Sequence, residues 1–270
     1  MSKHTLRSSS LLLFCAPLAS CASYAVPGRP ADLSIFMKDG ELDPVRQTDE
    51  RPVGALGLEE LLARRPMAAF PSGVAVARIQ APGYGEHGAA HTAGLGSFTI
   101  VTSRTAEEVA AFERLSALPM VAGIAPVNRL LVPDELSGDL ELRRIAARLH
   151  ADMLLVYTLD TSTVTDELSS SFLLGLLTLG VYVHQETELV CTGSAVLLDT
   201  RTGYVYGTAE ASTRREKEHS LHGAADRIER ERERIERATL EELAADLERT
   251  WNGVVAVYAP TTSDSPRGTQ

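Results

Sequence analysis

The sequence has few cysteines, few aromatic residues and no apolar run long enough to cross a membrane as a helix. Three cysteines occur among its 270 residues, and aromatic residues make up 5% of the chain. With so few large rings, the core has to be built mainly from leucine, valine, isoleucine and alanine. The two main apolar runs, 11–16 and 172–183, are shorter than the about 20 residues that a transmembrane helix needs.

The amino-terminal segment has the layout of a bacterial export signal. Lys3 and Arg7 supply a basic start, the apolar run 11–16 follows, and small residues lead to Cys21. The tetrapeptide Leu-Ala-Ser-Cys at 18–21 resembles a lipobox, which implies that Cys21 is diacylated and becomes the first residue of the mature protein. Each acyl methylene buried in a bilayer contributes about 0.8 kcal/mol, so several chains anchor a protein stably.

The residue after the cysteine bears on which membrane holds the protein. In lipoproteins, an aspartate at this position usually means retention in the inner membrane. Ala22 stands there in this chain. The resemblance therefore implies the outer membrane, with the protein on its periplasmic face and held through acylated Cys21.

The net charge argues against two classes of partner. The formal charge of the whole chain is −10, and residues 1–20 carry Lys3, Arg7 and no acid, so their removal leaves −12. A strongly acidic body does not favour nucleic acid as a partner, nor electrostatic binding to anionic lipid.

Cysteine usage excludes an internal disulfide in the mature chain. Cys15 leaves with the export signal and Cys21 is acylated, which leaves Cys191 alone. Cys191 stands in a strand-like run, and no patterned histidine accompanies it as a catalytic base would. We interpret it as a small buried apolar residue.

Composition and periodicity divide the chain into four parts. Residues 1–20 are the signal peptide, 21–54 a lipidated tether, 55–258 an α/β periplasmic domain and 259–270 a disordered tail. The pattern predicts helices at 56–65, after Ser103 or Thr105, at 137–150 and at 221–251, and strands at 74–79, 98–102, 120–126, 152–159, 187–198, 204–213 and 254–258. We expect an α/β (α+β) fold with a mixed sheet of about five to six strands, helices packed on it and a long carboxy-terminal helix.

The motifs that usually carry chemistry are weak in this chain. The segment 83–88 matches GxGxxG, but no amphipathic helix follows it as a dinucleotide site requires, so we favour a surface loop. His87 and His91 have a spacing that can bind metal on a helix, yet the segment lacks helical character. No serine-hydrolase elbow or phosphate-binding loop is present. We therefore assign no catalytic, cofactor-binding or metal-binding residue.

Two segments allow both a structural and a functional interpretation. The run 172–183 is favoured as a buried strand, but it also fits a contact with the membrane or a neighbouring subunit. The residues of that contact are Phe172, Leu173, Leu174, Leu176, Leu177 and Leu179. The charged stretch 227–237 is favoured as a solvated helix over a partner-binding one, because its heptads are not sustained.

Three pieces of the sequence carry a resemblance to bacterial envelope lipoproteins. They are ADMLLV at 151–156, LLTLGVYV at 176–183 and the hairpin VLLDTRTGYVY at 196–206. Their order resembles the α/β periplasmic domain of the curli-secretion lipoprotein and the amino-terminal domain of the Tol translocation protein. Over residues 55–257 the layout is similar to the rhombotarget-type lipoproteins, a family without an established activity, so the resemblance implies no catalytic residues.

We expect a lipid-anchored periplasmic protein that acts as a non-enzymatic accessory or assembly factor, without a cofactor and with an unidentified envelope protein as partner. One alternative is a subunit of an oligomeric outer-membrane secretion channel, which requires a homo-oligomer. The other is a hydrolase or a nucleotide-binding enzyme.

Overall fold

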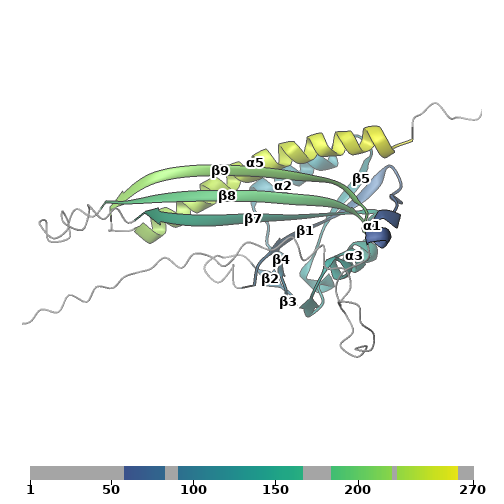
Figure 1. Cartoon of the computed structure of the whole chain (residues 1–270), viewed down its shortest axis with the longest axis horizontal. Coiled ribbons are helices and arrows are strands. Elements are labelled where there is room, and N and C mark those ends of the chain that lie inside the picture. Colours follow the sequence, from purple (N-terminus) through teal and green to yellow (C-terminus); the bar gives the residue numbers. More distant parts are fainter. Residues whose placement is uncertain (1–57, 83–90, 167–183, 221–223, 261–270) are drawn as a thin grey trace, which may run out of the picture.

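The computed structural model describes residues 58–82, 91–166, 184–220 and 224–260 (Figure 1). Within these ranges no helix is both long and apolar enough to cross a membrane. The elements follow in this order: α1 Leu58–Ala63, β1 Ser72–Gln80, β2 Thr92–Ala93, β3 Leu95–Gly96, β4 Thr99–Val101, α2 Ala106–Ser116, β5 Val121–Pro126, the 3₁₀ helix η2 Arg129–Leu131, β6 Glu135–Leu136, α3 Asp139–Arg148, β7 Met153–Asp166, β8 His184–Asp199, β9 Val205–Ser220 and α5 Ala224–Tyr258.

A seven-stranded mixed sheet forms the centre of the molecule and confirms the expected α/β class. Its order is β2-β4-β1-β7-β8-β9, and β5 pairs with β1 beside β4. Strand β1 is parallel to β5 and β7 and antiparallel to β4, whereas β7, β8 and β9 form an antiparallel meander. A two-stranded parallel sheet, β3-β6, lies outside this sheet.

Helices cover the sheet on both faces because β1 and β7 are apolar on both sides. Val74 and Val76 of β1 pack with α2 and α5, while Ala75, Ala77 and Ile79 pack with α3 on the opposite face. The alternation of these side chains along one strand follows the two-residue period of β-structure. The body therefore has three layers, with α3 on one side of the sheet and α2 with α5 on the other (Figure 1).

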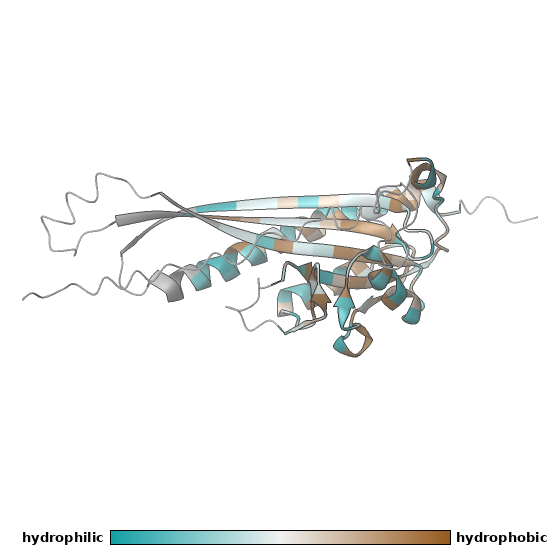
Figure 2. Ribbon diagram, turned by 60° about the horizontal axis from the view of Figure 1, so that its bottom comes forward, coloured by the Kyte–Doolittle hydropathy of each residue, from teal (hydrophilic) through white to brown (hydrophobic). Residues whose placement is uncertain are grey.

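The ribbon of β7, β8 and β9 is much longer than β1 and projects beyond it, with α5 alongside (Figure 1). At about 3.3 Å per residue, the 16 residues of β8 span about 50 Å. The 35 residues of α5 span a similar length at 1.5 Å per residue. Helix and ribbon are thus matched in length. The coloured part of the first half of α5 is strongly hydrophilic (Figure 2).

Small residues on the ribbon let α5 approach the sheet closely. Ala195, Ala209 and Ala211 are buried beneath the helix. A Cβ atom added to Gly193 would lie 3.2 Å from side-chain atoms of Leu243 and Thr239. At Gly207 the added Cβ would lie only 2.6 Å from Cγ2 of Thr250, a separation that real Cβ atoms essentially never show.

Helix α5 also supplies hydrogen bonds to the backbone of β9, which has no further strand partner among the described residues. The backbone N–H of Glu210 donates to the carboxylate of Asp246 at 3.1 Å. The hydroxyl of Thr250 donates to the carbonyl oxygen of Thr208 at 3.2 Å. These contacts satisfy polar groups on a sheet edge, where unpaired backbone otherwise attracts other strands.

The predicted strand at 254–258 is wrong, because these residues form the last turns of α5. Val254 is buried beside Trp251, and Tyr258 contacts Tyr204. The intrinsic preference of VVAVY for β-structure is outweighed by the helical spacing of its contacts. The sequence pattern does not predict the short elements β2, β3, η2 and β6. Strands β7, β8 and β9 are longer than predicted, and of the two candidate caps Thr105 caps α2.

Replacing Gly207 with alanine is expected to destabilise the protein by about 1–3 kcal/mol, because the methyl group overpacks the contact with Thr250. Urea unfolding measures the loss. In a Thr250→Ser background, which removes Cγ2 but keeps the hydroxyl, the same substitution should cost clearly less. Gly123→Ala on β5 is the matched control, since a Cβ there meets nothing within 4 Å. Equal costs of Gly207→Ala in both backgrounds would contradict the close-contact explanation.

Candidate functional site

The residues that the sequence singled out for contact with a membrane or partner lie outside the described residues. This holds for Cys21 and for the apolar run 172–183, whose contact residues are Phe172, Leu173, Leu174, Leu176, Leu177 and Leu179. The run connects the end of β7 to the start of β8. Both interpretations of it remain predictions. Also outside these residues are the GxGxxG segment at 83–88 with His87, the tether at 21–54, and residues 261–270 of the predicted tail 259–270.

Cys191 is fully buried on β8, in agreement with its interpretation as a small core residue. It packs with Leu189 and Ile235 beneath α5. Burial raises the pKa of its thiol, which makes it a poor nucleophile. In the part of the chain that the structure describes, no three His, Cys, Asp or Glu side chains lie close enough together to hold a metal ion.

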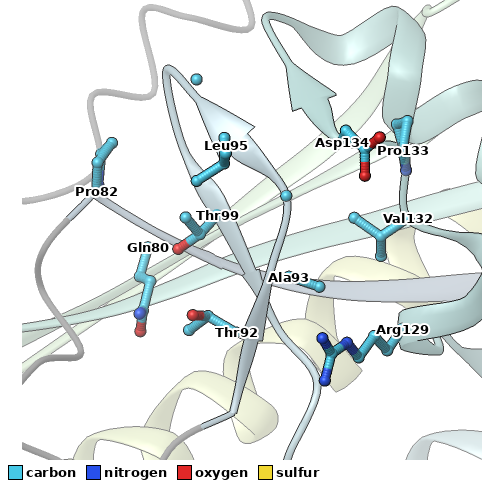
Figure 3. Close-up of a pocket in the computed structure, with 12 residues that line it drawn as sticks. Gln80, Pro82, Thr92, Ala93, Leu95, Thr99, Arg129, Val132, Pro133 and Asp134 are labelled. Carbon is cyan, nitrogen blue, oxygen red and sulfur yellow. The ribbon is translucent and has the colours of Figure 1, made fainter.

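A cleft of about 540 Å³ lies between the β2–β4 region and the loop that contains η2 (Figure 3). Polar side chains line both of its sides: Gln80, Thr92 and Thr99 on the strands and Arg129 and Asp134 on the loop. These groups can hydrogen-bond to a ligand, but the lining residues include no nucleophile paired with a general base. The described lining of the cleft therefore offers hydrogen-bonding groups from two sides to a polar ligand.

The shape of this cleft depends on two glycines. Gly94 has a φ of 85° and Gly96 a φ of 118°, in the region that favours glycine. Added Cβ atoms would lie 2.3 Å from Cδ1 of Leu136 and 2.4 Å from its carbonyl oxygen, respectively. Gly94 and Gly96 thus let the chain pass close to β6. They belong to the glycine-rich stretch whose composition suggested a surface loop.

A buried carboxylate, Glu108, joins α2 to the sheet. Its Oε1 accepts from Arg78 at 2.9 Å and from the Tyr157 hydroxyl at 2.7 Å. Its Oε2 accepts from the backbone N–H of Thr105, whose own hydroxyl accepts from the N–H of Glu108. Burial raises the pKa of Tyr157 well above its ordinary value, so the phenol stays protonated and donates. Glu108 thus belongs to the capping box of α2 and also forms an ion pair with Arg78 of β1, which joins the helix to the sheet.

Beside Glu108 lies a cavity of about 160 Å³ between α2 and α5. Arg78, Glu107, Glu236 and Arg237 contribute charged groups to its lining. Glu107 pairs with Arg237 at 2.7 Å, which links the two helices. The sequence indicated this site only indirectly, through Arg78 as the sole charge in an apolar strand and through the Thr-x-x-Glu spacing of the capping box.

A second buried carboxylate, Asp199, organises the turn between β8 and β9. Its Oδ1 accepts from the backbone N–H groups of Arg201 and Thr202 at 2.8 and 3.0 Å. Its Oδ2 accepts from the N–H of Met67 at 2.6 Å and from the hydroxyl of Tyr206 at 2.9 Å. The predicted turn is confirmed: Gly203 has a φ of 69°, and its N–H donates to the carbonyl of Asp199.

The pKa values of the two partners at this site, Asp199 and Tyr206, are shifted in opposite directions. Burial alone would raise the pKa of Asp199, but the hydrogen bonds from Met67, Thr202, Tyr206 and Arg201 outweigh it and lower the pKa. Burial and the adjacent carboxylate raise the pKa of Tyr206 to about 12. The pair therefore stays charged on Asp199 and neutral on Tyr206 at physiological pH.

The same turn holds the chain that precedes β1. The hydroxyl of Thr202 donates to the carbonyl of Arg65 at 2.8 Å, and Arg64 donates to the carbonyl of Gly203 at 3.2 Å. The N–H of Ala68 donates to the Tyr206 hydroxyl at 3.0 Å. We call residues 64–68 with the turn 199–204 the Asp199 clamp. Sequence reasoning found the turn but missed the clamp, because nothing local marks a turn aspartate as a partner of residues more than 130 positions away.

Aromatic rings attach the end of α5 to this clamp. Tyr204, Tyr206 and Tyr258 form three edge-to-face pairs, with ring centroids 5.1–6.2 Å apart. The hydroxyls of Tyr204 and Tyr258 lie 2.9 Å apart, within hydrogen-bonding distance. The clamp, the β8–β9 turn and the carboxy-terminal end of α5 thus meet at one end of the molecule.

Replacing Asp199 with asparagine is expected to cost about 2–3 kcal/mol of unfolding free energy at pH 7, because one amide oxygen cannot replace a carboxylate that accepts four hydrogen bonds. The depressed pKa of Asp199 means that its stabilisation is present above about pH 5 and is lost as the pH falls below about 4. Urea unfolding between pH 7 and pH 2.5 should therefore show a smaller acid dependence in the variant.

Hydrogen exchange supplies the local measurement for this variant. The amides of Met67, Arg201 and Thr202 should exchange faster once Asp199 is changed. Asp134→Asn is the matched control, since Asp134 is exposed and its substitution should leave both stability and exchange unchanged. Unaltered protection at Met67 would show that Asp199 does not hold the clamp.

Solved structures of low sequence identity resemble this chain, among them one from Neisseria meningitidis and one from Chlamydia trachomatis. No protein-family model and no curated protein matches the chain. The lipoprotein GNA1162 of Neisseria meningitidis is 13% identical, with 60% of this chain and 94% of that chain covered and a TM-score of 0.26. The protein CT253 of Chlamydia trachomatis is 10% identical, with 69% and 94% covered and a TM-score of 0.23. The structure neighbours thus include a bacterial lipoprotein, at TM-scores too low for the likeness to bear on function.

Proposed function

We propose that this protein is a lipid-anchored periplasmic protein of the bacterial outer membrane that acts as a non-enzymatic accessory or assembly factor. Acylated Cys21 attaches it to the membrane, and residues 21–54 serve as the tether. The finer proposal is a relationship to the rhombotarget-type lipoproteins, with a domain like that of the curli-secretion lipoprotein and the Tol translocation protein.

One structural observation carries the proposal: the two ends of the body differ. The Asp199 clamp holds the chain that arrives from the amino-terminal side at one end (Figure 1). The ribbon of β7–β9 and the first half of α5 extend to the opposite end. An anchored protein of this shape keeps one end near its membrane and presents the other to a partner.

Paired charges run along the far half of the molecule. On α5, Arg232 bridges Glu229 and Glu236, and Arg234 pairs with Glu231. On the ribbon, Arg214 pairs with Glu188. Arg234 and Arg214 are the exposed members of these pairs, with 66% and 65% of their side chains accessible, so they are the charges that a polar partner meets there.

Cys21→Ser is expected to release the full-length chain from the outer-membrane fraction and to abolish labelling with radioactive palmitate, because acylation requires the thiol. Cell fractionation and autoradiography of the immunoprecipitated protein measure the two effects. Cys191→Ser, which alters a buried thiol, is the matched control and should retain both.

Ala22→Asp tests the choice of membrane separately. It should keep the palmitate label but move the protein to the inner membrane.

A Cys21→Ser protein that is still membrane-bound and still labelled would overturn the lipid anchor.

The channel-subunit alternative is favoured by one specific observation. Beyond Tyr157, β7 loses its pairing with β1, and β9 has no outer strand partner among the described residues. A ribbon with two open edges can pair with copies of itself. In this alternative the apolar run 172–183, which joins β7 to β8, lies at the contact between subunits.

Photo-crosslinking in intact cells separates these two functions. With a photoreactive residue in place of exposed Ser212 on β9, the accessory function predicts adducts with a different envelope protein. Position Leu130, 91% exposed on η2, serves as the control and should yield few adducts. A ladder of discrete homo-oligomers at Ser212 would instead support the channel subunit.

A further inference from the structure

Exposed apolar side chains gather at the end of the molecule that carries the Asp199 clamp. Nine large hydrophobic residues are exposed in the described part of the chain, and six of them belong to segments that meet at this end. These six are Leu58, Leu61, Leu62, Met67, Val205 and Val257. Met67 donates to Asp199, Val205 follows the turn directly, and Val257 precedes the tyrosine that contacts Tyr204.

Helix α1 concentrates this apolar surface. Leu58 and Leu62 are 71% and 69% exposed, Leu61 is 37% exposed, and no residue of α1 is buried. At 100° per residue the three leucines fall on one face, while Glu59 and Glu60 lie on the other. No described residue thus buries the apolar face of α1. The ribbon in Figure 2 shows the hydropathy of each residue at this end of the molecule.

Arginines follow α1 along the chain. Arg64 comes directly after the helix, with its guanidinium on the carbonyl of Gly203. Arg65 comes next and is exposed, and Arg201 of the turn is 63% exposed on its side chain and pairs with Asp152 at 3.9 Å. A helix with one apolar face, followed by arginines, has the composition of segments that lie in the interface of a bilayer.

We propose that the apolar face of α1, with Met67 beside it, docks onto the surface of the membrane that holds the lipid anchor. The inference rests on the proposed acylation of Cys21. Residues 21–57 separate that cysteine from α1, and a chain of this length reaches at most about 130 Å when fully extended. The bilayer surface is therefore always within reach of α1, which is the first described element after the tether.

The lipid anchor also strengthens the small contact between α1 and the membrane. Three leucines on a helix of six residues bind a membrane weakly by themselves. Tethering converts their contact with the bilayer into an intramolecular event at high effective concentration. Docking of α1 orients the body, because the Asp199 clamp fixes residues 64–68 rigidly on the β8–β9 turn. The ribbon is then directed away from the membrane.

Site-specific fluorescence in the acylated, full-length protein tests this orientation. Leu62→Cys, Glu60→Cys and Leu130→Cys place a thiol on the apolar face of α1, on its opposite face and on a distant loop. Each is labelled with an environment-sensitive nitrobenzoxadiazole dye. The native Cys191 is fully buried and does not compete for the dye. The proteins are reconstituted into vesicles of three parts phosphatidylethanolamine to one part phosphatidylglycerol.

The expected result is a blue-shifted emission at position 62. Quenching there by lipids that carry a shallow nitroxide should be at least about twofold stronger than at positions 60 and 130. Equal, water-like emission at all three positions in vesicle-bound protein would overturn the docking of α1 while leaving the anchor intact. Equal quenching at 60 and 62 would exclude the apolar face as the contact. Protein that does not float with the vesicles at all would refute the proposed acylation instead.

Discussion

The close contact between α5 and the β7–β9 ribbon is the constraint on which the rest of the fold depends. Beyond β1 the ribbon is a single layer of three strands, and such a layer cannot bury both faces by itself. Helix α5 covers one of them through a track of small residues that includes Gly193 and Gly207. The helix can then contribute Leu243 and Trp251 to the main core, and Trp251 also donates to the carbonyl of Pro119 beside α2. One helix thereby joins the narrow ribbon to the three-layer body.

Two buried carboxylates, Glu108 and Asp199, connect further segments of this architecture. Burying a carboxylate is costly unless every oxygen is hydrogen-bonded. Glu108 meets this condition by joining α2, β1 and β7, and Asp199 meets it by joining the β8–β9 turn to residues 67 and 206. In each case the buried charge also has a structural role. It connects segments that are far apart in sequence, and it does so with defined geometry because hydrogen bonds to a carboxylate are directional.

The sequence contained enough information for the class of the fold and for most of its elements. Apolar periodicity predicted the strands at 74–79 and 152–159 and the long helix, since local pattern and tertiary contacts agree there. It failed at 254–258, where a β-favouring pentapeptide forms the last turns of α5 and buries Val254 while Val257 is exposed. It also missed the roles of Glu108 and Asp199, because a capping residue and a turn residue carry no local sign of long-range partners. The contact of 172–183 with a membrane or a neighbouring subunit stays a prediction from composition alone.

The hydrogen bonds from Asp246 and Thr250 to β9 have a consequence for how the protein can assemble. They occupy backbone groups of Glu210 and Thr208, so the strand is closed to an incoming partner in the half nearest the clamp. A further strand can therefore pair with β9 only through residues after Ala211. If that half faces the membrane, growth of an assembly by strand addition is confined to the side remote from the lipid. The helix thus makes the two halves of an otherwise uniform sheet edge unequal as sites for strand pairing.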